Sequence, residues 1–188
     1  GSEMCIRDSI QVALPELHVT WLCVTLLSVL YFIYCSEMWN QLDALTGLLN
    51  QNSYLKQTGG VRCKGGVLVV FDVDDFKQIN DRYGHIQGDL CLAGIAECIK
   101  KSYANFGYCY RIGGDEFCVL LKNGGNEGRC KQEFLQRLQE KRGEIAFLPT
   151  VSYGSAPFSG EDIVKVKDRA DQDMYQYKKE RKNRKRLS

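Results

Sequence analysis

Residues Arg111–Phe117 read RIGGDEF, so two glycines and then two acids stand between two short apolar runs. The runs Tyr108–Ile112 and Phe117–Leu121 have the composition of strands, and the glycines between them predict a β-hairpin. Adjacent carboxylates repel each other, so Asp115 and Glu116 need a positive partner. This turn is therefore the first candidate for a functional site.

A second acidic stretch follows the most apolar strand candidate. Val67–Phe71, VLVVF, is a continuous run typical of a central strand covered on both faces, and Asp72 and Asp74 come directly after it. Ligands collect beside such strand ends, and residues two apart face the same way along a strand. With the hairpin of Asp115 and Glu116 beside this strand, three or four oxygens converge. Hard oxygen ligands suit Mg²⁺ or Mn²⁺, which we expect to be the positive partner.

The predicted metal also indicates a class of substrate. Mg²⁺ keeps coordination positions for water and for substrate phosphates. Glycines at the turn admit a close approach to the backbone, while Lys77 and the basic tail Lys178–Arg186 offer point charges for phosphates. These features predict a nucleoside triphosphate as substrate and phosphoryl or nucleotidyl transfer as the reaction.

The composition predicts one globular domain with a short appendage. The 188 residues are 44% apolar, and their formal net charge of +2 is too small to indicate nucleic acid as a partner. The nine cysteines include no C-x-x-C pair and lie mostly in apolar runs. They predict free thiols in a reducing compartment instead of disulfides or a zinc site.

Two N-terminal segments stand apart from the domain. Residues 1–9 lack a periodic pattern, and Met4–Ser9 resemble the translation of a sequencing adapter, so we expect the native N-terminus to be missing. Residues 10–35 predict an apolar helix, in which Leu17–Tyr34 contains no Asp, Glu, Lys or Arg. This run reaches the length of a membrane span, which we expect at 17–34. The alternative is a helix that pairs with another subunit, since no Lys or Arg follows before Lys56.

From residue 36 to residue 188, helical and strand patterns alternate without a long linker. This order predicts an α+β fold. Besides the hairpin and the central strand, the expected elements are helices at 90–103, 127–142 and 163–182 and a strand at 150–156.

Four motifs in chain order resemble the GGDEF-domain diguanylate cyclases. They are DALTGLLN (Asp43–Asn50), the block Asp72–Asp89, RIGGDEF, and RADQDMYQYKKERKN (Arg169–Asn183). The resemblance implies a palm-like fold similar to nucleotidyl cyclases, with a mostly antiparallel central sheet flanked by helices. The domain would occupy residues 36–188, after the apolar N-terminal helix.

The resemblance also implies a reaction, in which two GTP molecules become cyclic di-GMP with loss of two pyrophosphates across a homodimer. Asp72, Asp115 and Glu116 would be the catalytic residues, and with the carbonyl of Val73 they would hold Mg²⁺ or Mn²⁺. Asp115 would also help to deprotonate the attacking hydroxyl. We expect the enzyme at the cell inner membrane with its catalytic domain in the cytoplasm, or in the cytoplasm if 17–34 does not span the membrane.

Substrate-binding residues are implied in the same way. Asn80 and Asp89 match the positions that read guanine, although both residue types also cap helices. An acceptor at position 89 disfavours adenine by leaving polar groups unpaired. The other substrate-binding positions are Lys77, Lys178, Lys182, Gly113 and Gly114.

The sequence departs from the family pattern in three places. Arg181 stands where the family usually has Gly, and Lys182 stands where Arg is more frequent, which removes a bidentate fork. Residues 104–107 replace the R-x-x-D product-inhibition site, so we expect no feedback there.

Two rival functions stay open at this point. One is a non-catalytic receptor for GTP or a cyclic dinucleotide on the same fold, which the intact Asp72, Asp115 and Glu116 disfavour. The other is a cyclase of relaxed base specificity. For Asp74 and Asp75 we expect either a structural role or a role in supporting the metal ligands.

Overall fold

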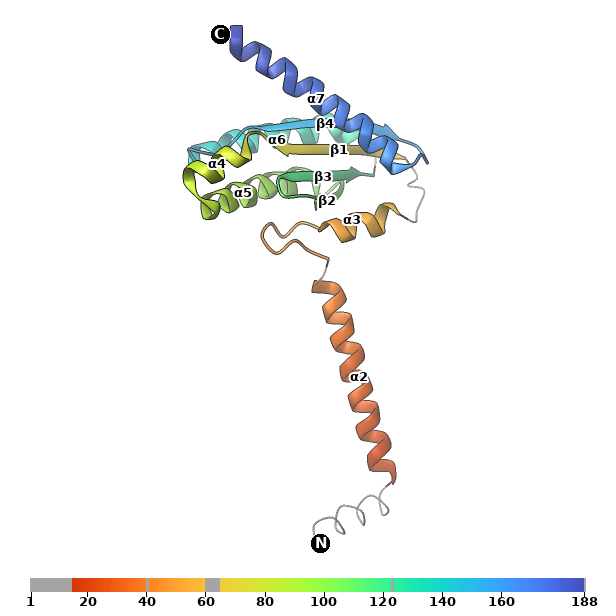
Figure 1. Cartoon of the computed structure of the whole chain (residues 1–188). Coiled ribbons are helices and arrows are strands. Elements are labelled where there is room, and N and C mark those ends of the chain that lie inside the picture. Colours follow the sequence, from red (N-terminus) through yellow and green to blue (C-terminus); the bar gives the residue numbers. More distant parts are fainter. Residues whose placement is uncertain (1–14, 40, 60–64, 123, 188) are drawn as a thin grey trace. The chain divides into compact units, whose positions relative to one another are not determined.

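The computed structural model describes residues 15–39, 41–59, 65–122 and 124–187 (Figure 1). The chain divides into two units, residues 1–40 and 41–188. The first contains helix α2 (Pro15–Trp39), and the other described elements belong to the second. The adapter-like residues 1–9 lie outside the described residues.

Helix α2 exposes apolar side chains along the part whose side chains are described. Trp21 and Phe32 are exposed by 64% and 72%. Thr25 and Ser28 turn their hydroxyls back to backbone carbonyls one helical turn earlier. Among the described residues, no helix is long and apolar enough to span a membrane. The span expected at 17–34 extends past the residues whose side chains are described, so it stays a prediction.

The second unit is built on a four-stranded sheet of order β2-β3-β1-β4 in which every neighbouring pair is antiparallel. The hairpin predicted around the two glycines is confirmed as β2 and β3, and the most apolar run is confirmed as a central strand. The expected α+β fold with a mostly antiparallel sheet is likewise confirmed. The strands are β1 (Gly66–Val73), β2 (Gly107–Arg111), β3 (Glu116–Leu121) and β4 (Val151–Phe158).

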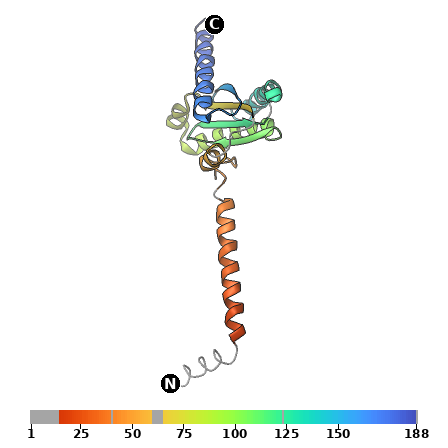
Figure 2. The ribbon, with the colours of Figure 1, turned by 90° about the vertical axis from the view of Figure 1, so that its right-hand side faces the viewer.

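Both faces of β1 are buried because helices cover both sides of the sheet (Figures 1 and 2). Val69 and Phe71 pack into the core beneath α5 and α6, whereas Leu68 and Val70 pack into the core beneath α3 and α7. This arrangement explains the unbroken apolar run, since alternate residues of a strand point to opposite faces. The four helices are α3 (Gln51–Thr58), α5 (His85–Tyr103), α6 (Glu127–Glu144) and α7 (Ile163–Leu187).

A short helix connects β1 to α5. Helix α4 (Phe76–Tyr83) begins after Asp75, whose φ of 55° makes the exit from β1 tight, and Gly84 with φ 87° separates α4 from α5. A 3-10 turn, η1 (Gly124–Asn126), precedes α6.

Helix α7 crosses β4 at very short range. A Cβ atom at Gly154 would lie 2.2 Å from the carbonyl oxygen of Ala170 and 2.2 Å from the nitrogen of Met174. Only glycine lets the two backbones approach so closely. The helix then continues past the sheet in both views (Figures 1 and 2), carrying Lys178 and Arg181 toward the end of β1.

Candidate functional site

The end of β1 lies beside the starts of β3 and β4, because both neighbours run antiparallel to it. Asp72 stands opposite Glu116 of β3 and opposite Ser152 of β4. Residues directly opposite in such pairs lie on the same face with Cβ atoms about 4.5–5.5 Å apart. The structure therefore brings two of the predicted catalytic acids together, and their like charges call for a nearby cation.

The turn that carries Asp115 is attached to the same strand end. The backbone N–H of Val73 donates to the carbonyl of Asp115 at 3.2 Å, and the N–H groups of Ile112 and Gly113 donate to the carbonyl of Glu116 at 3.0 and 3.3 Å. A Cβ at Gly113 would lie 3.2 Å from the Glu116 carboxylate, so glycine there leaves room for this side chain. Gly114 is exposed.

Arg111 anchors the turn that carries Asp115. Its guanidinium donates to the carbonyl of Gly114 at 2.7 Å and to the carboxylate of Asp43 at 3.0 Å. Asp43 also accepts from the backbone N–H and the hydroxyl of Thr46. Burial works to raise the pKa of Asp43, but its bonds to Thr46 and Arg111 outweigh burial and hold that pKa below its usual value. The DALTGLLN motif thus braces the hairpin, a contact that the motif's sequence did not reveal.

Asp74 is the centre of a network that the sequence did not predict. Its side chain is only 7% exposed. One carboxylate oxygen accepts from Ser152 at 2.7 Å and lies 3.3 Å from the Lys178 amine, while the other accepts from Thr150 at 2.8 Å and lies 2.9 Å from the Arg181 guanidinium. Burial opposes ionisation, yet the two hydroxyls and the two cations together lower the pKa of Asp74 below its usual value.

Lys178 supplies the cation beside the first acid. Its amine lies 2.5 Å from the carboxylate of Asp72 and also contacts Asp74. Burial disfavours the charged amine, but the hydrogen bond to Asp72 and the charges of both acids raise the pKa of Lys178. We call Asp72, Asp74, Lys178 and Arg181 the strand-end cluster.

The two predicted guanine readers lie on consecutive helices, Asn80 in α4 and Asp89 in α5. Neither caps a helix, because the N-cap positions are Asp75 and Gly84, so the capping alternative is wrong. The Oδ1 atom of Asn80 is buried and has no hydrogen-bond partner among the described residues. A Cβ at Gly88 would lie 2.0 Å from that atom, so glycine makes the space that Asn80 occupies.

A comparison with known families decides the relationship. The family described as "Diguanylate cyclase, GGDEF domain" matches residues 40–184, which include all four motifs. The chain belongs to the GGDEF family.

Relatives and solved structures agree with this assignment. The chain is 32% identical to diguanylate cyclase DgcS of Shewanella oneidensis over 154 residues, covering 78% of the chain and 52% of DgcS. It is 35% identical to diguanylate cyclase DgcP of Pseudomonas aeruginosa over 159 residues, covering 76% of the chain and 23% of DgcP. It thus spans about half or less of these relatives. The fold is similar to that of the coiled coil and GGDEF domain of DgcB from Caulobacter crescentus, with a TM-score of 0.73 and 23% identity over 88% of this chain and 95% of that one.

The donors expected for the metal in the GGDEF domain are not gathered into one cluster. Within the described ranges, no three or more His, Cys, Asp or Glu side chains gather as a metal site, so the convergence of three or four oxygens is absent. Instead Asp72 faces Glu116 across the strands and is ion-paired to Lys178. Mg²⁺ in such enzymes takes one or two carboxylates and fills its other positions with water and substrate phosphates. The chemistry of this acid pair therefore still fits a divalent ion.

The structure also locates the other predicted residues of the GGDEF domain. Lys77 is exposed on α4, and Asp75 is exposed at its start. The side chain of Lys182 lies outside the described part of the chain. The seven described cysteines are free, while Cys5 and Cys63 fall outside the described residues.

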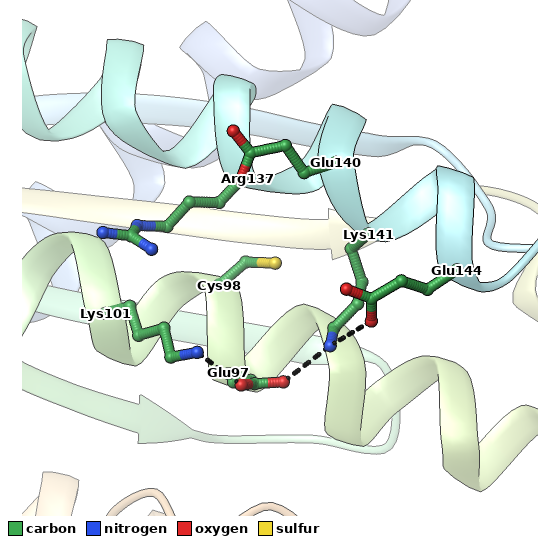
Figure 3. Close-up of a pocket in the computed structure, with 7 residues that line it drawn as sticks. All are labelled: Glu97, Cys98, Lys101, Arg137, Glu140, Lys141 and Glu144. Carbon is green, nitrogen blue, oxygen red and sulfur yellow. Dashed lines mark hydrogen bonds and ion pairs between the residues drawn. The ribbon is translucent and has the colours of Figure 1, made fainter.

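A second charged group lies away from these residues, between α5 and α6 (Figure 3). Glu97 pairs with Lys101 at 2.6 Å and with Lys141 at 2.8 Å, and Lys141 pairs with Glu144 at 2.8 Å. Hydrogen bonds from the two lysines lower the pKa of Glu97 to about 2. We call these four residues the helix cluster. It contains no residue that the motifs predicted.

Proposed function

We propose that this chain is the catalytic domain of a diguanylate cyclase, which condenses two GTP molecules into cyclic di-GMP and releases two pyrophosphates. The observation that carries the proposal is the pairing of Asp72 with Glu116 at the end of β1, within a family match that covers all four motifs. Two acids held opposite each other repel, so this strand end favours the binding of a cation.

The acids at this strand end are the proposed metal ligands. Asp72 and Glu116, with Asp115 and the carbonyl of Val73, would hold Mg²⁺ or Mn²⁺. When bound, such ions neutralise phosphate charge and lower the pKa of the attacking hydroxyl. Lys178 already stands at Asp72, so it would hold the triphosphate as a point charge, aided by Lys77 and Lys182.

The base would be read between α4 and α5. Asn80 would contact the base through its side-chain amide, whose Oδ1 atom is packed against Gly88. Asp89 would accept from the neighbouring N–H groups of guanine, which adenine lacks. Replacement of Asp89 by Ser should therefore admit ATP as a competitor. An unchanged preference for GTP in a competition assay would contradict this role.

Each domain would bind one GTP, so two copies must meet to form the product. The rate per protein molecule should consequently fall on dilution below the dissociation constant of the dimer. A rate per molecule that stays constant over a hundredfold dilution range would contradict a homodimer of that kind.

The decisive experiment incubates the full chain with GTP and Mg²⁺ and identifies products by mass spectrometry, with GTP binding measured in parallel. Cyclic di-GMP and pyrophosphate are the expected products. The alternative is a non-catalytic receptor, which gains support from the Lys178 amine lying directly on Asp72. Bound GTP that is never consumed would favour the receptor.

A further inference from the structure

Arg181 departs from the family pattern, and the structure shows what its side chain contacts. One terminal nitrogen of the guanidinium lies 2.9 Å from Asp74 and 3.3 Å from the carbonyl of Val151, and the other donates to the hydroxyl of Thr150. Its side chain is 26% exposed. The donors at the tip of Arg181 are thus directed at the protein, which separates it from a residue that reaches out for phosphate.

Both oxygens of the Asp74 carboxylate are held by this arrangement. Each of its oxygens has one hydroxyl and one cation: Ser152 with Lys178 on one oxygen, and Thr150 with Arg181 on the other. A buried carboxylate with this set of partners has a fixed orientation and a balanced charge. Loss of Arg181 would leave Lys178 as its single ion-pair partner in the described structure.

Lys178 is shared unequally between two acids. Its amine is 2.5 Å from Asp72 but 3.3 Å from Asp74. Because Coulomb attraction grows as distance and local dielectric fall, an uncompensated Asp74 would draw the amine away from Asp72. Arg181 and Lys178 are three residues apart on α7, so both face the strand end from the same side of the helix.

We propose that Arg181 is a positioning residue: it neutralises and orients Asp74, and thereby keeps the Lys178 amine beside Asp72, where the triphosphate arrives. The inference rests on the proposed function in one respect, namely the contact of Lys178 with GTP. It assigns to Asp74 the role of linking the two cations, in place of a metal ligand.

A double-mutant cycle tests this role. The full chain is compared with Arg181→Met, Lys178→Met and the double variant, and the dissociation constant for GTP is measured by calorimetry beside KM and kcat. Arg181→Met should weaken GTP binding about tenfold in the native background. In the Lys178→Met background the same change should alter binding by less than about twofold, because Lys178 carries the effect.

Two controls separate positioning from general loss of structure. Arg137→Met removes a guanidinium that pairs with Glu133 at 2.7 Å on α6, and it should leave GTP binding unchanged. Arg181→Lys keeps the charge but loses the fork to Thr150 and Val151, so its effect should lie between native and Arg181→Met. If Arg181→Met does not fold, the cycle built with Arg181→Lys decides the question.

Several outcomes would overturn the inference. Equal weakening in both backgrounds would make Arg181 a phosphate ligand in its own right. A lowered unfolding temperature with unchanged GTP affinity would leave it a purely structural brace. Product analysis of the native chain keeps the two proposals apart: GTP bound without product refutes the cyclase, whereas product formation with an additive cycle refutes positioning by Arg181 alone.

Discussion

The strand-end cluster and the helix cluster each contain two acids and two bases, yet they differ in origin and environment. In the first, Lys178 pairs with Asp72 across 106 positions of the chain, and the Asp74 side chain is 7% exposed. In the second, Glu97 pairs with Lys101 four positions away, and 44% of its side chain is exposed (Figure 3). Two clusters of equal charge therefore differ in burial and in how far apart their partners lie in the sequence.

Environment decides what each pair contributes. Exposed ion pairs are screened by water and salt and contribute little to stability. A buried carboxylate has lost its hydration, so removal of a charged partner leaves part of its charge uncompensated. The comparison predicts that changes in the strand-end cluster and its neighbours affect activity and stability strongly, and that changes in the helix cluster do not.

The largest expected effect is on turnover. Asp72→Asn or Asp115→Asn should lower the rate of cyclic di-GMP formation by about a thousandfold or more, since each removes a charge at the reacting phosphate. Glu97→Gln, the matched change in the helix cluster, should leave the rate unchanged. Rates from chromatographic product assays, with circular dichroism to verify folding, check this contrast. Full activity in Asp115→Asn would break it.

The next effect is on stability. Asp74→Ala should lower the free energy of unfolding by about 3–5 kcal/mol, because it leaves Arg181 without its buried partner. Glu97→Ala should lower it by about 1 kcal/mol or less. Urea unfolding followed by fluorescence measures both values. Similar losses for the two variants would show that burial does not distinguish the clusters.

A smaller effect concerns pH and Glu97. Its pKa in the folded protein lies at about 2, below the ordinary value of 4.5. A depressed pKa means that its stabilising contribution is present above about pH 4.5 and is lost as pH falls toward the folded pKa. The difference in stability between the native chain and Glu97→Gln should therefore shrink on acidification, while staying below about 1 kcal/mol throughout. A difference that grows below pH 4 would reverse the sign.

The smallest effect concerns salt. Raising NaCl from 0.1 M to 1 M shortens the screening length from about 10 Å to about 3 Å. The destabilisation caused by Glu97→Gln should then disappear, whereas that of Asp74→Ala should persist because water and ions reach the buried carboxylate poorly. Paired urea titrations at the two salt concentrations make the measurement, and equal salt sensitivity would erase the distinction.

The sequence predicted those features whose signals are local. A polar residue that ends an apolar run marked Asp72 at a strand end, and glycines between two apolar runs marked the hairpin of Asp115 and Glu116. Helix α5 was predicted from residue 90, but it begins at His85. Its first turn carries Ile86, which is 82% exposed, so the apolar spacing there gave no helical signal.

The features that could not be predicted depend on distant segments meeting. Arg181 and Thr150 are 31 positions apart, and Arg111 and Asp43 are 68 apart. Neither pair has a spacing that a helix or hairpin would impose, so only the crossing of α7 over β4 and the docking of the DALTGLLN loop reveal them. Asp74 could not be distinguished from an ordinary loop acid for the same reason.

The close crossing at Gly154 has a mechanical consequence. Helix α7 rests on β4 at this point, and Lys178 and Arg181 lie farther along the same helix. Adding one methyl group at position 154 would push α7 away from β4 and displace both cations at once, although that residue carries no charge and touches no acid. The proposed activity therefore depends on backbone clearance at an uncharged position that lies outside the set of acids and bases.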